Sequence, residues 1–320
     1  MKHLRLPTID DAEKARQRIS NYINRTPLLK LNMDIDDCEI YLKLENLQPI
    51  GAFKIRPAFN GILSLSDDEL KKGVYTISSG NMAFGLAWAA NKLSVPMVAY
   101  VYEGAPEIKL QGIRNQNGEI RFLPEDQWKR CIFLEEALEA TETMVHPVME
   151  NSVLAGNGTI AIEIIEDLPD VDAVLIPYGG GAATIGIGSI IKELKPDTRI
   201  VAIEATHATP LTQSLECGKS VRVDYQSTFV KSIGAVTVYD EILEFAKVIV
   251  DDVMVTSAEL IAEAIRVMYL RNKIIAEAAA AAPLAAALSN KSLKGKVVCI
   301  VSGGNVDMKE YAQILNGELP

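Results

Sequence analysis

Short apolar runs alternate with helical patterns along most of the chain. Residues 74–77 and 97–102 are runs of apolar, β-branched and aromatic residues, which predict buried strands, and residues 83–92 between them have helical spacing. The alternation resumes further along, with predicted strands at residues 173–176 and 296–301. Strands that alternate with helices are typical of parallel sheets assembled from βαβ units. The pattern therefore predicts an α/β protein.

Length and charge narrow the class of protein. With 320 residues, 48% of them hydrophobic, the chain is long enough for two lobes with a sizeable core. The formal net charge is -10 and Lys and Arg form no long block. Because nucleic acids are bound by clustered basic residues, we expect no nucleic-acid partner.

The spacing of the cysteines and the hydropathy of the chain predict the cellular compartment of the protein. The 4 cysteines have no paired short spacing, which predicts neither a zinc site nor a disulfide framework and fits a reduced, cytoplasmic location. We expect no signal segment and no membrane contact, because no apolar run reaches membrane-spanning length. The nearest one, residues 276–288, contains Glu277 and Pro283 and is interpreted as the start of a buried helix of small residues.

Three polar or glycine-rich loops each follow an apolar run. They are residues 78–81 (Ser-Ser-Gly-Asn), 179–182 (Gly-Gly-Gly-Ala) and 302–305 (Ser-Gly-Gly-Asn). Open α/β sheets bind ligands at the carboxyl ends of their strands, where these loops are expected. Backbone N–H groups of residues 179–182 would converge on an anion such as a phosphate; close packing is the alternative. Residues 179–182 do not fit a dinucleotide-binding fingerprint, which would follow the first strand of the chain. They do not fit a Walker loop either, because no Lys-Ser or Lys-Thr pair follows them.

Lys54 lies in the run Gly-Ala-Phe-Lys-Ile-Arg-Pro-Ala at residues 51–58. An isolated lysine is usually a solvated surface residue. Phe53 beside it, and Glu45 and Asn46 upstream, are an unusual setting for such a residue. A buried amine of lowered pKa would be competent to form an imine and to take up a proton. Lys54 is therefore a candidate Schiff-base lysine over which the three loops would hold one cofactor.

The ordered set of motifs resembles the serine/threonine dehydratase and serine racemase family of pyridoxal-phosphate enzymes. The matching segments are Phe53-Lys54-x-Arg56, residues 78–81, 155–159 (Ala-Gly-Asn-Gly-Thr), 179–181 and 302–305, and the similarity extends from about residue 8 to residue 315. The resemblance implies the tryptophan synthase beta-like fold (fold type II), with two open twisted sheets flanked by helices. It also implies pyridoxal 5'-phosphate as cofactor, an amino acid as substrate and a homodimer.

The resemblance assigns roles to individual residues. Lys54 would carry the cofactor as an imine, and Phe53 would pack against its ring. Asn81 would donate to the ring hydroxyl, and Ser302 would hydrogen-bond the pyridine nitrogen. The expected phosphate cup consists of Gly179, Gly180, Gly181 and Ala182. The expected site for the substrate carboxylate consists of Ser78, Ser79, Asn81 and the backbone of Met82.

The reaction that the resemblance implies is β-elimination from serine, threonine or a bulkier β-hydroxy amino acid. Lys54 would remove the Cα proton, the β-hydroxyl would leave, and a 2-oxo acid and ammonia would be released. Because the hydroxyl of Ser302 cannot fully protonate the pyridine nitrogen, the ring would be a weaker electron sink that suits elimination. A serine at the place of Ser79 can instead act as the acid of a racemase, opposite the lysine; a carboxylate hydrogen-bond donor is its other interpretation.

Two further classes stay open. A β-replacement enzyme would have a threonine-led asparagine loop, which the pair Ser78 and Ser79 speaks against. A non-catalytic pyridoxal-phosphate-binding protein would have little need of Lys54, Asn81 and Ser302 together.

Several residues depart from the family pattern near the expected substrate. Ala52 stands where serine is usual, Met82 replaces a histidine and Ala182 replaces a fourth glycine. The usual Asp-Gly pair is missing within residues 230–235, and five alanines follow Glu277. These small or apolar replacements would make room for a larger β-substituent and leave the substrate open.

Three other groups have both a functional and an ordinary interpretation. Residues 128–130 (Trp-Lys-Arg) lie in the segment expected to face the substrate, but they also fit the start of an amphipathic helix. No metal site of the family's type is expected, because Pro210 stands where an aspartate would follow Glu204. His146 and His207 are interpreted as structural.

The predicted organisation has two parts. Residues 1–48 and 146–320 would form a large cofactor-binding domain, and residues 49–145 a small mobile domain inserted in it. The active site would lie in the cleft between them, where closure would exclude water.

Overall fold

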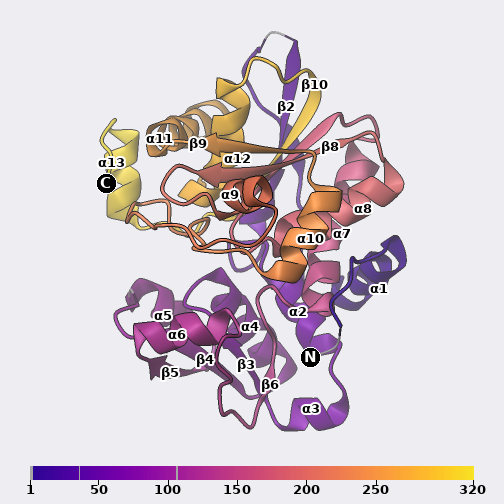
Figure 1. The fold of residues 1–320 in the computed structure, drawn as a ribbon. Helices are drawn as coiled ribbons and strands as arrows, with labels where there is room; N and C mark the ends of the chain where they lie inside the picture. The colour runs from indigo at the N-terminus through magenta and orange to yellow at the C-terminus, as the bar shows by residue number, and fades with distance from the viewer. Residues whose placement is uncertain (1–2, 36, 106) are drawn as a thin grey trace.

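Two separate sheets flanked by helices organise the protein, as Figure 1 shows. The computed structural model describes residues 3–35, 37–105 and 107–320. The strands of the first sheet are β1 (Leu28–Lys30), β2 (Cys38–Leu44), β7 (Ala173–Pro177), β8 (Arg199–Ala205), β9 (Asp252–Thr256) and β10 (Gly295–Val301). The strands of the second are β3 (Val74–Ile77), β4 (Met97–Tyr102), β5 (Glu119–Leu123) and β6 (Thr143–Met144). The predicted α/β class with two open sheets is confirmed.

The first sheet has the strand order β1-β2-β10-β7-β8-β9. Only β1 pairs in the antiparallel direction, with β2; the other pairings are parallel. The last strand in the sequence, β10, therefore occupies an inner position between β2 and β7. The carboxyl ends of these three strands meet at one edge of the sheet, which brings the loops that follow them together.

Both faces of the large sheet are covered, which explains why its inner strands are almost continuously apolar. Val174 and Ile176 point into one core, while Ala173 and Leu175 point into the other. The first core packs under α1 (Ile9–Ile19), α2 (Ile55–Leu63), α7 (Asn151–Asp167), α8 (Ala182–Leu194), α9 (Pro210–Cys217) and α10 (Asp240–Ile249). The second packs under α11 (Ala258–Val267), η2 (Met268–Asn272), α12 (Ala278–Ser289) and α13 (Met308–Leu315).

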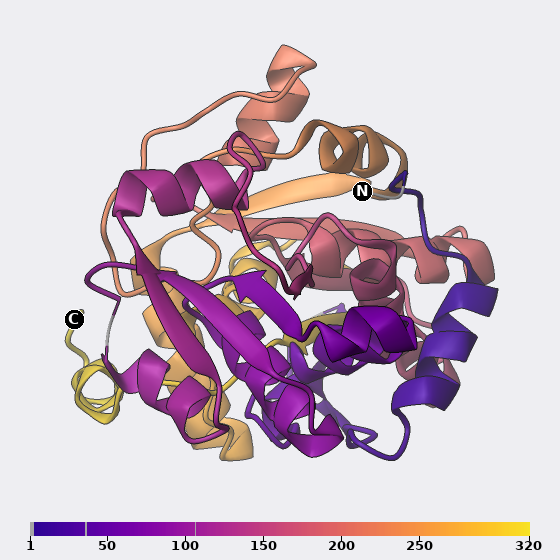
Figure 2. The ribbon, with the colours of Figure 1, turned by 90° about the horizontal axis from the view of Figure 1, so that it is seen from below.

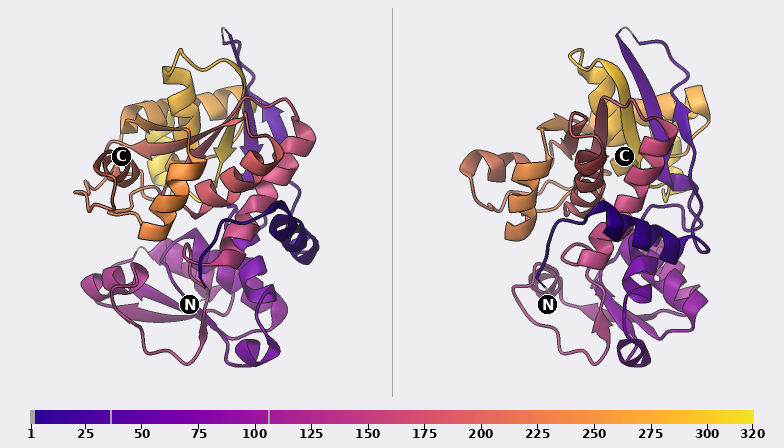
Figure 3. Two further views of the ribbon diagram at one scale, coloured as in Figure 1. Left: turned by 45° about the vertical axis from the view of Figure 1, so that its right-hand side comes forward. Right: turned by 90° about the vertical axis from the view of Figure 1, so that its right-hand side faces the viewer.

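The second sheet is smaller and wholly parallel, with the strand order β5-β4-β3-β6. Its surrounding helices are α3 (Asp67–Lys71), α4 (Asn81–Leu93), α5 (Glu107–Arg114) and α6 (Glu125–Ile132). Figure 2 views this sheet from below, and Figure 3 shows α1 running along the junction between the two halves of the molecule. A short 3-10 helix, η1 (Glu45–Leu47), follows β2 and precedes the crossing into α2.

Local sequence signals explain several helix starts. Thr8 caps α1, and its side chain and that of Asp11 form a reciprocal capping box. The glycine-rich loops lead straight into helices, since α4 begins at Asn81 and α8 at Ala182. Helix α12 is the predicted buried helix of small residues: its alanines are buried and pack against β7, β8, β9 and β10.

Candidate active site

The lysine loop is paired with the loop that follows β10. The chain turns at Gly51, whose φ of 70° is a conformation that favours glycine. The N–H of Phe53 donates to the carbonyl of Ser302 at 3.0 Å, and the N–H of Gly304 donates to the carbonyl of Gly51 at 2.8 Å. Segments from opposite ends of the chain are thus joined like two strands. Lys54 stands directly beyond this pairing, at the N-terminus of α2.

The amine of Lys54 lies in an apolar setting. Its side chain is only partly exposed, and Nζ lies 4.9 Å from the centre of the Phe53 ring. Burial lowers the pKa of Lys54 to about 8, and no carboxylate among the described residues offsets that effect. More of the amine is therefore uncharged near neutral pH than in an ordinary lysine, and the uncharged form is the one that acts as a nucleophile or a proton acceptor.

Helix α4 brings a second predicted loop to the lysine. A Cβ on Gly85 would stand 3.1 Å from the carbonyl oxygen of Lys54, so only glycine allows the helix to approach this closely. Asn81 lies one turn earlier, where α4 begins. Gly80 precedes it as an N-cap without a side-chain hydrogen bond, which leaves backbone N–H groups of the first turn available for an anion.

Asn81 is oriented by partners from two other parts of the chain. Its Nδ2 donates to both carboxylate oxygens of Glu277, at 3.1 and 3.3 Å. Its Oδ1 accepts a hydrogen bond from Nδ2 of Asn305 at 2.9 Å. The N–H of Glu277 donates to the carbonyl of Gly303, and a Cβ on Gly303 would stand 2.8 Å from Oε1 of Glu277. Sequence reasoning noted Glu277 only for the alanines behind it and missed this central position.

Residues 179–182 form a turn with little room for side chains. Gly181 has a φ of 91° and is the N-cap of α8, which has no side-chain cap. A Cβ on Gly180 would stand 2.6 Å from Cγ2 of Val148, and one on Gly179 would stand 2.9 Å from the carbonyl oxygen of Ser232. No side chain of the turn therefore covers the first backbone N–H groups of the 13-residue helix α8. This arrangement suits a phosphate.

The remaining predicted residues are buried or partly exposed around these loops. Ser302, the first residue after β10, has 4% of its surface exposed. Three of the departures from the family pattern are buried, with exposed fractions of 0% for Ala52, 2% for Met82 and 2% for Ala182. Ser78 and Ser79 are partly exposed, and the Ser78 hydroxyl accepts the N–H of Gly80 at 3.3 Å.

A cavity of about 430 Å³ opens beside these residues. Gly80, Asn81, Glu277 and Asn305 line one part of it, and Ser232 lines another. The asparagine loop and the loop after β10 thus border one space. The glycine-rich turn does not line this cavity, but Gly179 lies against the carbonyl of Ser232, which does.

A fully buried cluster of charges supports α2 from behind. The guanidinium of Arg56 donates to Glu45 at 2.7 and 2.8 Å and to Glu163 at 2.7 and 2.9 Å. Lys43 also donates to Glu163 at 2.5 Å, and Thr26 donates to Glu45 at 2.6 Å. Burial alone would lower the pKa of Arg56, but the two carboxylates outweigh it and raise the pKa. Arg56 therefore keeps its charge, and its hydrogen bonds to the two carboxylates fix the start of α2.

His146 organises the segment that joins β6 to α7. Its Nδ1 accepts the N–H groups of Val148 and Met149 at 3.0 and 2.9 Å, so Nε2 carries the proton and donates to the carbonyl of Ile132 at 3.0 Å. Tyr239 donates to the same carbonyl at 2.7 Å. Burial lowers the pKa of His146 to about 4, which keeps the ring neutral. The segment that places Val148 against the glycine-rich turn is therefore held by a neutral histidine.

Residues 128–130 occupy the last turns of α6 and have ordinary partners. The indole of Trp128 donates to the carbonyl of Tyr100 at 3.0 Å. Lys129 pairs with Glu125 at 2.7 Å, and Arg130 pairs with Glu136 at 2.8 Å. They serve the packing and surface of α6, although the helix begins earlier, at Glu125, than the ordinary interpretation expected.

Glu204 has partners within the protein. Its carboxylate accepts the N–H groups of Leu211 and Thr212, at 2.7 and 2.9 Å, and the hydroxyl of Thr212 at 2.6 Å, where α9 begins. Across residues 3–35, 37–105 and 107–320 no group of three or more His, Cys, Asp or Glu residues is arranged to hold a metal ion. Within the same residues, no helix has the length and apolarity that a bilayer crossing requires.

Comparison with known proteins decides the family. A family described as "Pyridoxal-phosphate dependent enzyme" matches residues 19–303. The chain is a pyridoxal-phosphate-dependent enzyme. Its cofactor is therefore pyridoxal phosphate, and the arrangement of two sheets is that of fold type II. The expectation from the ordered motifs is confirmed.

Similar proteins in this family include lyases and a racemase. The L-threonine ammonia-lyase of Thermotoga maritima is 35% identical over 315 residues, which cover 97% of this chain and 78% of that protein. The catabolic L-threonine dehydratase of Staphylococcus aureus is 33% identical over 317 residues, which cover 96% and 92%. The structure of maize serine racemase superposes with a TM-score of 0.87 at 30% identity and covers 98% of both chains.

The residues present fit the cofactor. The turn at residues 179–182 offers bare backbone at a helix N-terminus for the phosphate. Lys54 supplies an amine of lowered pKa, and Ser302 supplies a buried hydroxyl on the loop paired with it. The hydroxyl of Tyr178, directly before the turn, is buried and has no hydrogen-bond partner among the described residues.

Proposed function

We propose that this enzyme is an ammonia-lyase that converts a β-hydroxy amino acid, with threonine and serine as the first candidates, into a 2-oxo acid and ammonia. The observation that carries the proposal is the amine of Lys54, which has a lowered pKa and lies beside the loop of Ser302. The similarity to an L-threonine ammonia-lyase and an L-threonine dehydratase over nearly the whole chain supports this substrate class.

Each loop would have a separate task. Residues 179–182 would hold the cofactor phosphate, Ser302 the pyridine nitrogen, and Lys54 and Phe53 the reactive side of the ring. Asn81 would donate to the ring hydroxyl while Glu277 fixes its amide. Ser78, Ser79, Asn81 and the N–H of Met82 would receive the substrate carboxylate.

When bound, the cofactor supplies the electron sink that makes the Cα hydrogen of the substrate acidic. Lys54 would take that proton at Nζ, for which its lowered pKa suits it. The β-hydroxyl leaves as water, and one water is taken up again when the released enamine hydrolyses. The net change is one amino acid to one 2-oxo acid and one ammonia.

The two sheets would form separate domains, with residues 49–145 as the mobile one and residues 1–48 and 146–320 as the larger one. The division is supported by the smaller sheet, β3 to β6, which lies entirely within residues 49–145. Two contacts cross between the parts. Arg222 pairs with Glu135 at 2.7 Å, and Tyr239 donates to the carbonyl of Ile132 at 2.7 Å. Closure of the small domain would exclude water from the site. We further propose a homodimer in the cytoplasm.

The test is 2-oxo acid release from L- and D-serine, L- and D-threonine and bulkier β-hydroxy amino acids. The wild type should release the 2-oxo acid and show the visible absorbance band of the lysine-bound cofactor, and Lys54→Ala should lose both. A protein that has the band but releases no 2-oxo acid from any of them would refute the lyase.

A racemase is the second candidate, favoured by Ser79 and by the similarity to maize serine racemase. Ser79 would exchange the Cα proton on the face opposite Lys54. In that case Ser79→Ala would abolish interconversion of L- and D-serine, measured by chiral chromatography, and would leave elimination in place. A variant that loses both activities equally would instead show that Ser79 only binds the carboxylate.

A further inference from the structure

The cavity of about 430 Å³ beside Asn81 is distinct from the residues that would hold the cofactor. Neither Lys54, nor Ser302, nor residues 179–182 line it, whereas Gly80 and Asn81 of the asparagine loop do. Its volume lies within the range of small-molecule pockets, which is roughly 300–1,000 Å³. A cofactor held by Lys54 and the glycine-rich turn would therefore leave this cavity to the substrate.

The inner wall of the cavity is apolar. Its side chains include Phe229, Ile265, Ala276, Ala278, Tyr311 and Ile314, none of which is more than 9% exposed. The alanines leave space that larger side chains would fill. An apolar group that entered this space would be removed from water, which favours its binding.

Phe84 adds an aromatic ring from the side of the smaller sheet. It lies on α4 three residues after Asn81, so the two side chains are neighbours on one face of the helix. Gly112 of α5 allows the ring a close approach, since a Cβ there would stand 3.2 Å from Cδ2 of Phe84. Trp88 meets the same ring edge to face, with 6.2 Å between the ring centres. The ring of Phe84 is therefore held in place one turn from the asparagine loop.

The charged groups of the cavity already have partners. Lys231 pairs with Glu310 at 2.6 Å, and their side chains are 44% and 39% exposed, which places this pair on the solvent side. Asp307 accepts two backbone N–H groups as the N-cap of α13, and Glu277 accepts the amide of Asn81. The charges are thus used within the protein, and a neutral side chain on the ligand suits the cavity better than a charged one.

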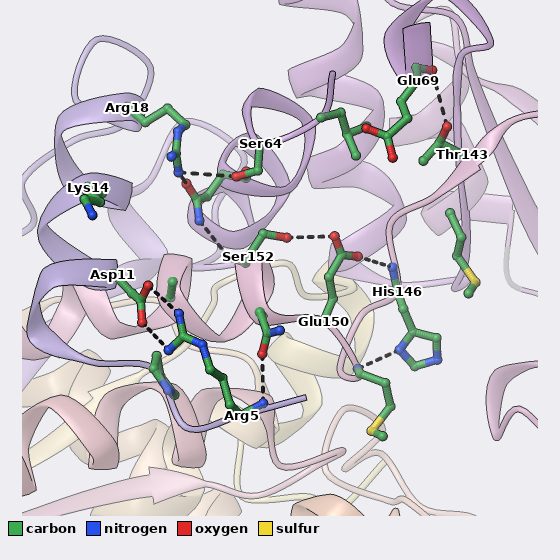
Figure 4. Close-up of a pocket in the computed structure, with 17 residues that line it drawn as sticks. Arg5, Asp11, Lys14, Arg18, Ser64, Glu69, Thr143, His146, Glu150 and Ser152 are labelled. Carbon is green, nitrogen blue, oxygen red and sulfur yellow. Dashed lines mark hydrogen bonds and ion pairs between the residues drawn. The ribbon is translucent and has the colours of Figure 1, made fainter. Parts of the chain in front are cut away.

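The cavity of about 410 Å³ beside α1 has a different lining (Figure 4). Arg5, Asp11, Lys14 and Arg18 are among its walls, and Arg5 pairs with Asp11 at 2.6 Å. No Phe, Tyr or Trp of the described chain lines it. Aromatic rings with a buried apolar wall are therefore a particular feature of the cavity beside Asn81.

We propose that the enzyme prefers a β-hydroxy amino acid whose β-substituent is an aromatic ring, with β-phenylserine as the probe. This inference rests on the proposed lyase function and names its substrate class. The carboxylate would lie at the first turn of α4, and the ring would enter the cavity beside Phe84. The β-hydroxyl and the Cα proton leave as water, and one water is taken up again on hydrolysis of the enamine. The net change is β-phenylserine to phenylpyruvate and ammonia.

Calorimetric titration of the cofactor-loaded enzyme measures the preference without turnover. The ligands are L-phenylalanine and L-2-aminobutyrate, neither of which has a β-hydroxyl to lose. We expect L-phenylalanine to bind at least about tenfold more tightly, because it carries a ring where L-2-aminobutyrate carries a methyl group. Equal affinities, or tighter binding of L-2-aminobutyrate, would overturn the inference.

Release of 2-oxo acid from β-phenylserine, L-threonine and L-serine separates this inference from the lyase itself. We expect the highest kcat/KM for β-phenylserine, by at least about tenfold. Release from threonine or serine but not from β-phenylserine would refute the aromatic preference and leave the lyase intact. If none of the three released a 2-oxo acid, the lyase would be refuted, whereas tighter binding of L-phenylalanine would still support an aromatic ligand for the cavity.

Variants locate the ring in the cavity. Phe84→Leu keeps an apolar side chain but removes the ring, and it should weaken L-phenylalanine about threefold to tenfold while affecting L-2-aminobutyrate less. Ala278→Leu fills the cavity and should weaken L-phenylalanine about tenfold. The two changes alter the volume in opposite directions, so one suffices if the other variant does not fold.

The matched control is Phe122→Leu on β5, where the ring is 49% exposed and lies outside the cavity. This variant should bind both ligands as the wild type does. A preference for L-phenylalanine that survived in both Phe84→Leu and Ala278→Leu would place the ring elsewhere and would refute the inference.

Discussion

Lys54 and Arg56 stand two residues apart at the start of α2, yet the protein treats these two cations in opposite ways. Arg56 is completely buried between Glu45 and Glu163, which raise its pKa against the effect of burial. Lys54 has the apolar ring of Phe53 beside it, and burial lowers its pKa to about 8. Burial alone therefore does not decide the charge of a basic group. The fold places carboxylates around Arg56, which holds α2 in place, whereas no carboxylate of the described residues pairs with Lys54, the proposed reactive residue.

Removal of Lys54 should have the largest effect on activity. We expect Lys54→Ala to lower the rate of 2-oxo acid release by at least about 10³-fold, because both the attachment point of the cofactor and the proton acceptor are lost. The free energy of unfolding in urea should change little, since Lys54 pairs with no carboxylate of the described chain. Lys54→Arg is the control that keeps a positive charge. If Lys54→Arg retained activity, the role of a neutral amine would be excluded.

Removal of one carboxylate from the Arg56 cluster should mainly lower stability, whereas removal of Lys54 should mainly lower activity. Glu163→Ala leaves Lys43 and Arg56 buried with one carboxylate fewer, and we expect the free energy of unfolding to fall by about 3–5 kcal/mol. Urea denaturation measures this change. The matched control is Glu166→Ala on the same helix, whose partners Arg16 and Arg25 lie at the surface and which should cost about 1 kcal/mol or less. Equal losses of unfolding free energy in Glu163→Ala and Glu166→Ala would contradict the contrast between the buried cluster and the surface pairs.

The pH dependence of Lys54 sharpens the comparison further. Only the uncharged amine reacts with electrophiles, so labelling of Lys54 should rise with pH and reach half of its maximum at about 8. The measurement is the labelling rate of the Lys54 peptide in cofactor-free protein, by mass spectrometry, with the surface lysines of the same digest as internal standards. A Lys54 peptide that is labelled with the same pH profile as those standards would disprove the effect of burial.

The smallest effect should come from the edge of the cluster. Thr26→Val removes the hydroxyl that donates to Glu45 at 2.6 Å, and we expect a loss of about 1–2 kcal/mol in the free energy of unfolding. Activity at saturating substrate should stay as in the wild type, because Glu45 keeps both hydrogen bonds from Arg56. Parallel urea titrations and rate assays of the two proteins test this. A large loss of activity would mean that the cluster acts on the chemistry and not only on the position of α2.

The parts of this protein that sequence reasoning predicted are those with a local signal. Strands such as β3, β4, β7 and β10 are short apolar runs, and the glycine-rich loops after them mark the ends of parallel strands. Lys54 drew attention because its immediate neighbours are unusual. The helix bounds were less well placed: α4 spans Asn81–Leu93, whereas the helical pattern was assigned to residues 83–92.

What sequence reasoning missed depends on contacts between distant segments. Lys43 sits within an apolar strand pattern, and nothing local indicates that Glu163 will neutralise it from α7. Glu277 was noted for the alanines behind it, because its contact with Asn81 arises only when the two sheets come together. His146 was expected to be structural, but the segment it holds could not be named without the fold. These roles depend on where the residues lie in the folded protein, and no periodic pattern in the sequence indicates them.

The inner position of β10 has a consequence for how the enzyme is made. This strand lies between β2 and β7, and the loop after it pairs with the backbone of Gly51 and Phe53. A ribosome must therefore deliver nearly the whole chain before the middle of the large sheet can close. Until then β2 and β7 lack their common neighbour, and Lys54 lacks the partner segment that holds its loop. We therefore expect a chain that terminates before residue 302 to be unstable and to bind the cofactor poorly.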